Sequence, residues 1–186
     1  MEQAIHYLHV ADQKFSKWLY DNNKHETFCT WIEWTIHGFP WFVFSTLGLI
    51  VAYGKGLNEH LQFWLLLLNI GLYLDLILIA IIKFNVQRER PVKSYNHLVE
   101  HTVDVYSFPS GHCSRAAMII VMTLGFYPYC QYLFMLVPIV VGLSRVALGR
   151  HYISDIIAGI IIGIMEGLFI LRTPIGLNAV FRSILK

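Results

Sequence analysis

The chain has 186 residues, a length that corresponds to a single domain. Hydrophobic residues make up 56% of it and charged residues 14%, whereas soluble domains average about 45–50% and about 25%. So little charge excludes an ordinary soluble fold, and a net charge of +2 does not indicate nucleic-acid binding. The composition predicts an integral membrane protein. Its three cysteines have neither a disulfide nor a metal-binding spacing.

Residues 1–33 form the first predicted region. From Ile5 to Leu19, apolar side chains recur at helical spacing opposite Lys and Asp, a pattern typical of an amphipathic helix on a membrane surface. A soluble docking helix is the alternative. Charged residues spread along this region argue against a cleavable signal peptide. We therefore expect an interfacial helix region over 1–33 and a membrane-embedded domain over 34–186.

Five later segments are apolar enough to cross a bilayer: 34–53, 61–82, 110–126, 132–148 and 154–171. The clearest of them, 61–82, would extend about 33 Å as a helix, which matches a hydrocarbon core of about 30 Å. The expected fold is an all-α membrane bundle of five helices, or six if the first also crosses. Alternating directions bring the end of the second span, the start of the third and the turn between the fourth and fifth to one side. Polar residues cluster there, which predicts a site.

The first polar segment follows the second span. Lys83 and Arg90 are seven residues apart, so on a continuous helix they would share a face two turns apart. Two cations that face one way at a membrane boundary suit a phosphate group. Cations that reach the membrane surface without binding a ligand are the alternative interpretation.

The second segment, Ser110-Gly111-His112, directly precedes an apolar helix. Serine is a good N-cap and glycine allows close approach of the backbone, so unpaired N–H groups there could bind an anion. His112 would then lie where a proton can be passed to a leaving group. An ordinary cap beside a surface histidine is the alternative.

The third segment contains Arg145, His151 and Asp155. His151 and Asp155 are spaced i, i+4, so on a helix the carboxylate could accept a proton from one ring nitrogen and direct the other outward. This is the arrangement of an activated nucleophile, and Arg145 would add a third cation for the phosphate. A simple contact on a helix surface is the alternative for the His–Asp pair.

In this order, the strings KFNVQRERP, PSGH and SRVALGRHYISD resemble the signature of the type 2 phosphatidic acid phosphatase superfamily, which includes vanadium haloperoxidases. The resemblance implies a six-helix membrane fold and a metal-independent phosphatase that needs no cofactor. By the same resemblance, His151 would be the nucleophile that forms a phosphohistidine, and Asp155 would orient it. His112 would be the general acid and then the base. The phosphate ligands it implies are Lys83, Arg90, Ser110, Gly111 and Arg145.

The strings VDVYSFPSGHCSRAAM, GLSRVALGRH and LDLILIAIIK are most similar to the animal polyisoprenoid diphosphate phosphatases, also called presqualene diphosphate phosphatases. That branch implies isoprenoid diphosphates or monophosphates as substrates, ahead of phosphatidate and sphingoid phosphates. It also implies a location in the endoplasmic reticulum and nuclear envelope. Two functions of other classes remain as alternatives: a non-catalytic membrane scaffold, and an anion transporter that uses the basic site.

Three further features of the sequence have two interpretations each. His97, Glu100 and His101 match a zinc-protease pattern, but they lie in a predicted loop without an evident third ligand, and we interpret the match as a coincidence. Asp75 and Glu166 lie inside predicted spans. An intramembrane carboxylate suggests function, although interhelical hydrogen bonding or a protonated acid is the interpretation we favour for both.

Overall fold

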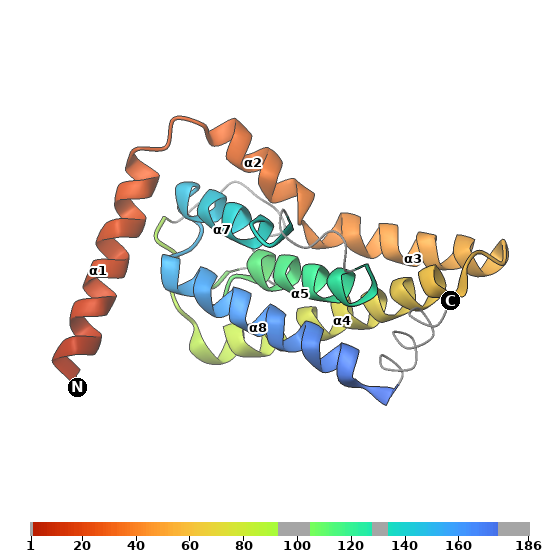
Figure 1. Ribbon diagram of the computed structural model, residues 1–186. Coiled ribbons are helices and arrows are strands. Elements are labelled where there is room, and N and C mark those ends of the chain that lie inside the picture. Colours follow the sequence, from red (N-terminus) through yellow and green to blue (C-terminus); the bar gives the residue numbers. More distant parts are fainter. Residues whose placement is uncertain (1, 93–104, 128–133, 175–186) are drawn as a thin grey trace.

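The computed structural model describes residues 2–92, 105–127 and 134–174, and the regular elements in these ranges are all helices. This confirms the predicted all-α fold class. The helices are α1 (Glu2–Asp21), α2 (Glu26–Thr35), α3 (Gly38–Gly54), α4 (Glu59–Val86), α5 (Gly111–Phe126), α7 (Val137–Ala147) and α8 (Ile153–Arg172). Figure 1 shows α5 beside α8 within the bundle, and α1 at one end, steeply inclined to the other helices.

Among the described residues, three apolar segments are long enough to cross a membrane: Glu26–Gly54, which contains α2 and α3, Glu59–Val86 and Ile153–Arg172. Helices α5 and α7 are apolar but shorter. Each predicted span therefore corresponds to a helix, although the predicted span 132–148 is described only from residue 134. Region 1–33 contains α1 and most of a second helix, α2, and its position at the membrane surface stays a prediction.

Pro40 explains why α2 and α3 are separate helices. Proline has no N–H, and its ring clashes with the carbonyl of the residue four positions earlier, here Ile36. The chain turns at Ile36 and His37 before α3 begins. The Ile36 carbonyl instead accepts a hydrogen bond of 3.3 Å from Arg115 of α5. The break between α2 and α3 thus supplies a backbone acceptor for a buried cation.

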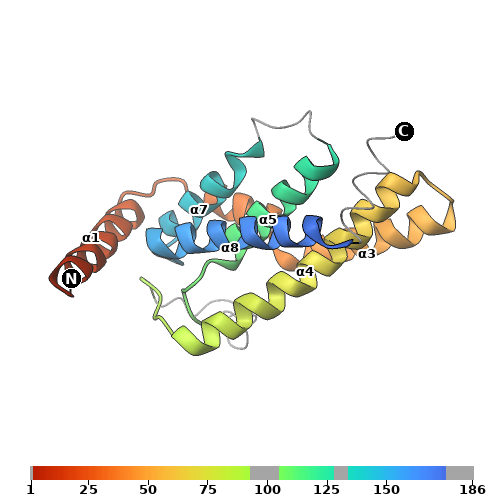
Figure 2. The ribbon, with the colours of Figure 1, turned by 60° about the horizontal axis from the view of Figure 1, so that its bottom comes forward.

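Glycines on α8 allow this helix to pack against the backbone of α5. Gly159, Gly163 and Gly167 recur every four residues, so they lie on one face of α8. A Cβ atom added at Gly159 would clash with the Ser110 carbonyl, and one at Gly163 with the backbone of Ser114. Small residues permit such close helix contact in membranes. Figure 2, which turns the bundle by 60°, again shows α5 and α8 in contact.

The two intramembrane carboxylates make interhelical contacts, as the favoured interpretation predicted. Asp75 of α4 lies 3.1 Å from the guanidinium of Arg115 on α5. Glu166 of α8 accepts a hydrogen bond of 3.2 Å from the Ser114 hydroxyl, also on α5. All four residues are buried. The cluster therefore joins three helices through polar contacts inside the apolar bundle.

Helix α1 contacts the bundle through polar side chains. Asp12 accepts a hydrogen bond from the Ser154 backbone N–H (3.2 Å), and Ser16 accepts one from the Ile153 N–H (3.1 Å). These are N–H groups of the first turn of α8, which otherwise lack intrahelical partners. The exposed apolar side chains of α1, Tyr7, Leu8, Phe15 and Trp18, lie on a different face. Most of the apolar face of the predicted amphipathic helix thus stays uncovered, although Leu19 packs against a buried apolar cluster.

Candidate active site

The three polar segments meet at one end of the bundle. Lys83, in the last turn of α4, donates a hydrogen bond to the Tyr106 carbonyl, just ahead of α5. The Ser110 N–H at the start of α5 donates to the Asp155 carbonyl of α8 at 3.0 Å. The Val92 N–H donates to the Gly149 carbonyl between α7 and α8 at 3.1 Å. These bonds confirm the predicted convergence of the segments on one side.

His151 lies in the turn before α8 and is 1% exposed. Its Nδ1 is 2.7 Å from the carbonyl oxygen of Ser107. A carbonyl only accepts hydrogen bonds, so the neutral ring must carry its proton on Nδ1. The lone pair is then on Nε2, which lies 3.5 Å from a guanidinium nitrogen of Arg145. The ring therefore presents an unprotonated nitrogen beside a cation that suits a phosphate.

Asp155 lies close to His151, but its contacts differ from those expected. His151 precedes α8, so the two residues do not share a helical face. Oδ2 of Asp155 is 3.7 Å from His151 Nδ1, beyond hydrogen-bond range, and accepts a 2.9 Å bond from the Tyr152 N–H. The carboxylate caps α8 while its charge faces the ring. The Ser107 carbonyl, which the sequence analysis did not identify, makes the orienting hydrogen bond.

Lys83 and Arg90 also depart from the expected geometry. Helix α4 ends at Val86, because Gln87 adopts a left-handed conformation with φ 51°. Arg90 therefore lies in an irregular segment, not two turns further along the helix. The Arg88 carbonyl in this segment accepts a hydrogen bond of 2.9 Å from the Ser107 N–H. This bond joins the segment to the residue that holds His151.

The start of α5 has the predicted location. Ser110 occupies the N-cap position and is buried, but its side chain makes no capping hydrogen bond. Gly111 is the first residue of the helix, and a Cβ there would lie 3.3 Å from Ile79. The His112 ring lies edge-on to the ring of His37, with centroids 5.9 Å apart. The start of α5 is thus bonded to the first turn of α8, and the His112 ring contacts that of His37.

Arg145 is the most deeply enclosed cation of the site, at 1% exposure. Its guanidinium forms an ion pair with Glu33 of α2, whose side chain is 20% exposed. Nothing in the sequence around Glu33 indicated this contact, because α2 is remote from the three segments in the chain. In this structure, a carboxylate thus lies against a cation that was predicted to bind phosphate.

Arg88 and Asp12 were also missed by the sequence analysis. Arg88 donates hydrogen bonds to Asp155 (2.6 Å), Ser154 (2.7 Å) and Asp12 (3.0 Å). Arg88 lies inside the string KFNVQRERP, so the sequence could have indicated it as a site residue, but only Lys83 and Arg90 were identified as candidates. Asp12 offered no signal, because an acidic residue on an amphipathic helix normally faces water.

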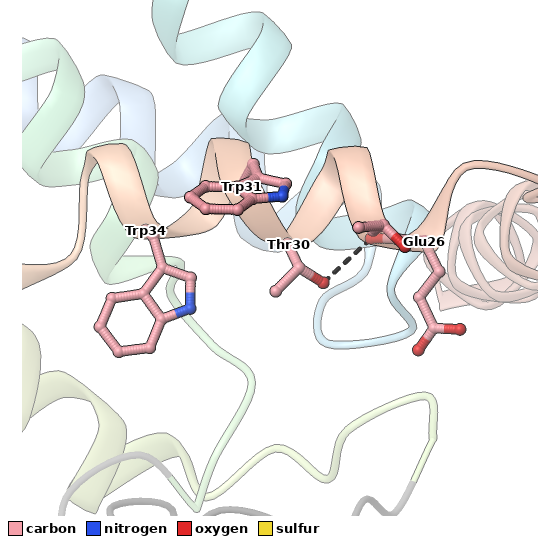
Figure 3. A pocket seen from close by; sticks show the side chains of 5 residues that line it. Glu26, Thr30, Trp31 and Trp34 are labelled. Carbon is pink, nitrogen blue, oxygen red and sulfur yellow. Dashed lines mark hydrogen bonds between the residues drawn. The ribbon is translucent and has the colours of Figure 1, made fainter.

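An open groove of about 490 Å³ runs along α2 close to this end of the bundle. Its lining includes Trp31, Trp34 and Thr30, and Thr30 bonds the Glu26 carbonyl at 2.9 Å (Figure 3). The Trp34 ring lies 5.2 Å from that of His37, the ring that contacts His112. An aromatic surface therefore extends from an exposed face of the bundle to the start of α5.

His97, Glu100 and His101 lie outside the described residues, so the zinc interpretation is not tested. Within residues 2–92, 105–127 and 134–174, no three His, Cys, Asp or Glu side chains are grouped closely enough to hold a metal ion.

A buried histidine beside a buried arginine, at the end of an apolar bundle, is typical of a membrane protein that acts on phosphate groups. Residues 64–177 match the family model described as the PAP2 superfamily. The chain therefore belongs to the PAP2 superfamily, and with its membrane-span candidates and lipid phosphatase relatives it is a membrane lipid phosphatase of the PAP2 type.

Two relatives of the chain have names that state a phosphatase activity. The chain is 32% identical over 148 residues to a probable lipid phosphate phosphatase beta of Arabidopsis thaliana, covering 62% of this chain and 68% of that protein. It is 30% identical over 140 residues to phosphatidylglycerophosphatase B of Bacillus subtilis strain 168, covering 64% and 63%. The chain thus spans slightly less than two thirds of the Bacillus enzyme.

Two solved structures have the same fold. A transmembrane PAP2-type phosphatidylglycerolphosphate phosphatase from Bacillus subtilis superposes with a TM-score of 0.66 at 23% identity, covering 90% of this chain and 87% of that chain. LpxE from Aquifex aeolicus superposes with a TM-score of 0.60 at 20% identity, covering 86% and 94%.

Proposed function

We propose that the protein hydrolyses isoprenoid diphosphates or monophosphates through a covalent phosphohistidine on His151. One observation carries the catalytic part of this proposal. The Ser107 carbonyl holds the proton on Nδ1, so the Nε2 lone pair points toward Arg145, where a phosphate would bind. A buried nucleophile that needs no prior deprotonation suits phosphoryl transfer, in which positioning and charge neutralisation supply most of the rate enhancement.

In the proposed first step, Nε2 of His151 attacks phosphorus while the bond from phosphorus to the leaving oxygen breaks. His112 donates a proton to that oxygen. Charge on the phosphoryl oxygens is neutralised by cations, a hydroxyl and a backbone N–H: Lys83, Arg90, Arg145, the Ser110 side chain and the Gly111 amide. As positive charge develops on the imidazole, Asp155 stabilises it.

In the second step, water attacks the phosphohistidine and His112 accepts a proton from it. The phosphorus–nitrogen bond breaks, inorganic phosphate leaves, and His151 returns to its neutral form. Both steps use side chains for charge neutralisation where other phosphotransferases use Mg²⁺, so the proposed reaction is metal-independent.

Two features support a lipid substrate with an apolar chain. One is the groove on α2, which is lined by Trp31 and Trp34, because the Trp34 ring contacts His37 and the His37 ring contacts His112; we propose that the lipid chain lies along it. The similarity of VDVYSFPSGHCSRAAM to the polyisoprenoid diphosphate phosphatases favours isoprenoid over glycerol-based phosphates. That similarity is also the basis for proposing residence in the endoplasmic reticulum and nuclear envelope, which imaging of a tagged chain in cells would test.

Phosphate release by the purified protein in EDTA is the central experiment. The substrates are an isoprenoid diphosphate, its monophosphate, phosphatidate, phosphatidylglycerol phosphate and a sphingoid phosphate. We expect release in EDTA, with the highest kcat/KM for the isoprenoid compounds. A rapid alkaline quench with ³²P-labelled substrate should trap an acid-labile label on wild type and none on His151→Ala. A folded protein that releases no phosphate would indicate a scaffold or a transporter, and faster cleavage of phosphatidate would overturn the substrate assignment.

A further inference from the structure

Arg88 lies where the segment after α4 meets α1 and the start of α8. One of its terminal nitrogens donates to Asp155 Oδ1 (2.6 Å) and to the Ser154 hydroxyl (2.7 Å), and the other donates to Asp12 Oδ2 (3.0 Å). The guanidinium carbon lies 4.0 Å from the centre of the Tyr152 ring. Its side chain is 18% exposed, against 12% for Asp12 and 0% for Asp155. Both terminal nitrogens of Arg88 are thus engaged within the protein.

The two oxygens of Asp155 have different partners. Oδ1 accepts from Arg88, while Oδ2 accepts from the Tyr152 N–H and is the oxygen that faces His151. A carboxylate held at both oxygens cannot rotate about its side-chain torsions. Without Arg88, only the Tyr152 bond would restrain it, and Oδ1 would be buried without this partner. Arg88 therefore determines how the carboxylate is presented to the histidine.

The charges of Asp155, Arg88 and Asp12 together set the electrostatic environment of His151. Arg88 alone would cancel the negative charge of Asp155, which is the charge that stabilises positive charge developing on His151. Asp12 offsets this effect, because the three groups together carry a net charge of −1. An arginine paired with a second carboxylate can thus hold Asp155 by hydrogen bonds and still leave one negative charge beside the histidine.

We propose that Arg88 is a positioning residue of the histidine site, and that Asp12 of α1 completes it by balancing its charge. On this proposal, α1 is part of the active-site structure in addition to any contact it makes with the membrane. The inference rests on the proposed function, since it assigns a role relative to the nucleophile His151. A purely structural role, in which Arg88 only attaches α1 to the bundle, is the competing explanation.

The test compares purified Arg88→Gln, Arg88→Lys and Asp12→Asn with wild type. Gln13→Ala is the matched control, because Gln13 follows Asp12 on α1, is exposed and hydrogen-bonds His9 on the same helix. We expect Arg88→Gln to lower kcat roughly 10–100-fold, the range seen when a supporting residue is lost or a reacting group is misplaced by about 1 Å. KM should change little, because the phosphate ligands are untouched.

The other variants keep the test informative if Arg88→Gln does not fold. Arg88→Lys keeps the charge but cannot bridge two carboxylates with a planar fork, so it should fold and show an intermediate loss in kcat. Asp12→Asn should lower kcat, with a small further loss when it is combined with Arg88→Gln, because its charge acts through Arg88. Thermal unfolding and circular dichroism of each variant establish how much protein is folded.

Two results would overturn the inference: a kcat per folded molecule of Arg88→Gln equal to that of Gln13→Ala, or a large rise in KM at constant kcat. The first would leave Arg88 a structural role, and the second would make it a substrate ligand. Failure of the proposed function gives a different result, because then His151→Ala would remain active or wild type would release no phosphate.

Discussion

The glycines of α8 provide a quantitative test of how α5 and α8, which carry proposed catalytic residues, are held together. An alanine Cβ at Gly163 would lie 2.7 Å from the carbonyl carbon and 2.9 Å from the Cα of Ser114, and closer still to the carbonyl oxygen. These are backbone atoms of α5, so no side-chain rotation can relieve the contact. The helices would have to separate by roughly 1 Å, and overpacking of this kind costs about 1–3 kcal/mol. We expect Gly163→Ala to lower the free energy of unfolding by an amount near the upper end of this range. This loss corresponds to a fall in Tm of roughly 5–10 °C for a chain of this length.

The same separation should reduce activity, because α5 carries His112 and α8 carries Asp155. A displacement of about 1 Å in a reacting group can cost about 100-fold in rate. The assays are thermal unfolding in detergent and phosphate release per folded molecule. Gly54→Ala is the control, because a Cβ at the end of α3 meets no atom within 4 Å. If Gly163→Ala matched Gly54→Ala in both Tm and rate, the close α5–α8 contact would not be what positions the site.

Three further predictions concern the reacting groups. Asp155→Asn should retain measurable single-turnover activity while His151→Ala retains none, because the Ser107 carbonyl still orients the ring; equal rates in the two variants would contradict this. Glu33→Gln should lower KM several-fold and tighten inhibition by inorganic phosphate, because it removes the carboxylate that competes for Arg145; an unchanged KM would mean that the pair does not oppose substrate. His112→Ala should slow release of an alcohol from an isoprenoid monophosphate far more than release of a monophosphate from the diphosphate, because an alkoxide needs protonation that a phosphate ester does not. Equal losses in single-turnover experiments would indicate that His112 only holds the phosphate.

Much of the fold could be predicted because the bilayer imposes simple requirements. Long apolar segments must be helical, and their alternating directions determine which ends lie together. The convergence of Lys83, Ser110 and Asp155 followed from this argument and was confirmed. The break between α2 and α3 was not predicted, since segment 34–53 was treated as one span although Pro40 lies near its start.

The detailed geometry of the site depends on contacts that sequence spacing does not encode. The i, i+4 spacing of His151 and Asp155 suggested a direct hydrogen bond on a helix, but α8 begins between them, and a loop carbonyl takes that role. Arg90 similarly leaves the helix of Lys83 because Gln87 ends α4. Glu33 and Asp12 come from helices far away in the chain. Only the packing of α1 and α2 on the bundle reveals their part in the site.

The buried contact between Asp75 and Arg115 has a consequence for how the chain enters the membrane during synthesis. A charged residue near the middle of a helix costs about 2.5–3.5 kcal/mol on the scale of translocon-mediated insertion. Asp75 lies near the middle of the 28-residue, strongly apolar α4, which can offset this cost, whereas Arg115 lies in the second turn of the 16-residue α5, which is short for a span. Helix α5 should therefore enter most readily beside an α4 already in place, with the two charges neutralising each other as they leave the translocon. Asp75→Asn would then reduce the yield of correctly inserted protein while leaving kcat of the inserted fraction close to wild type.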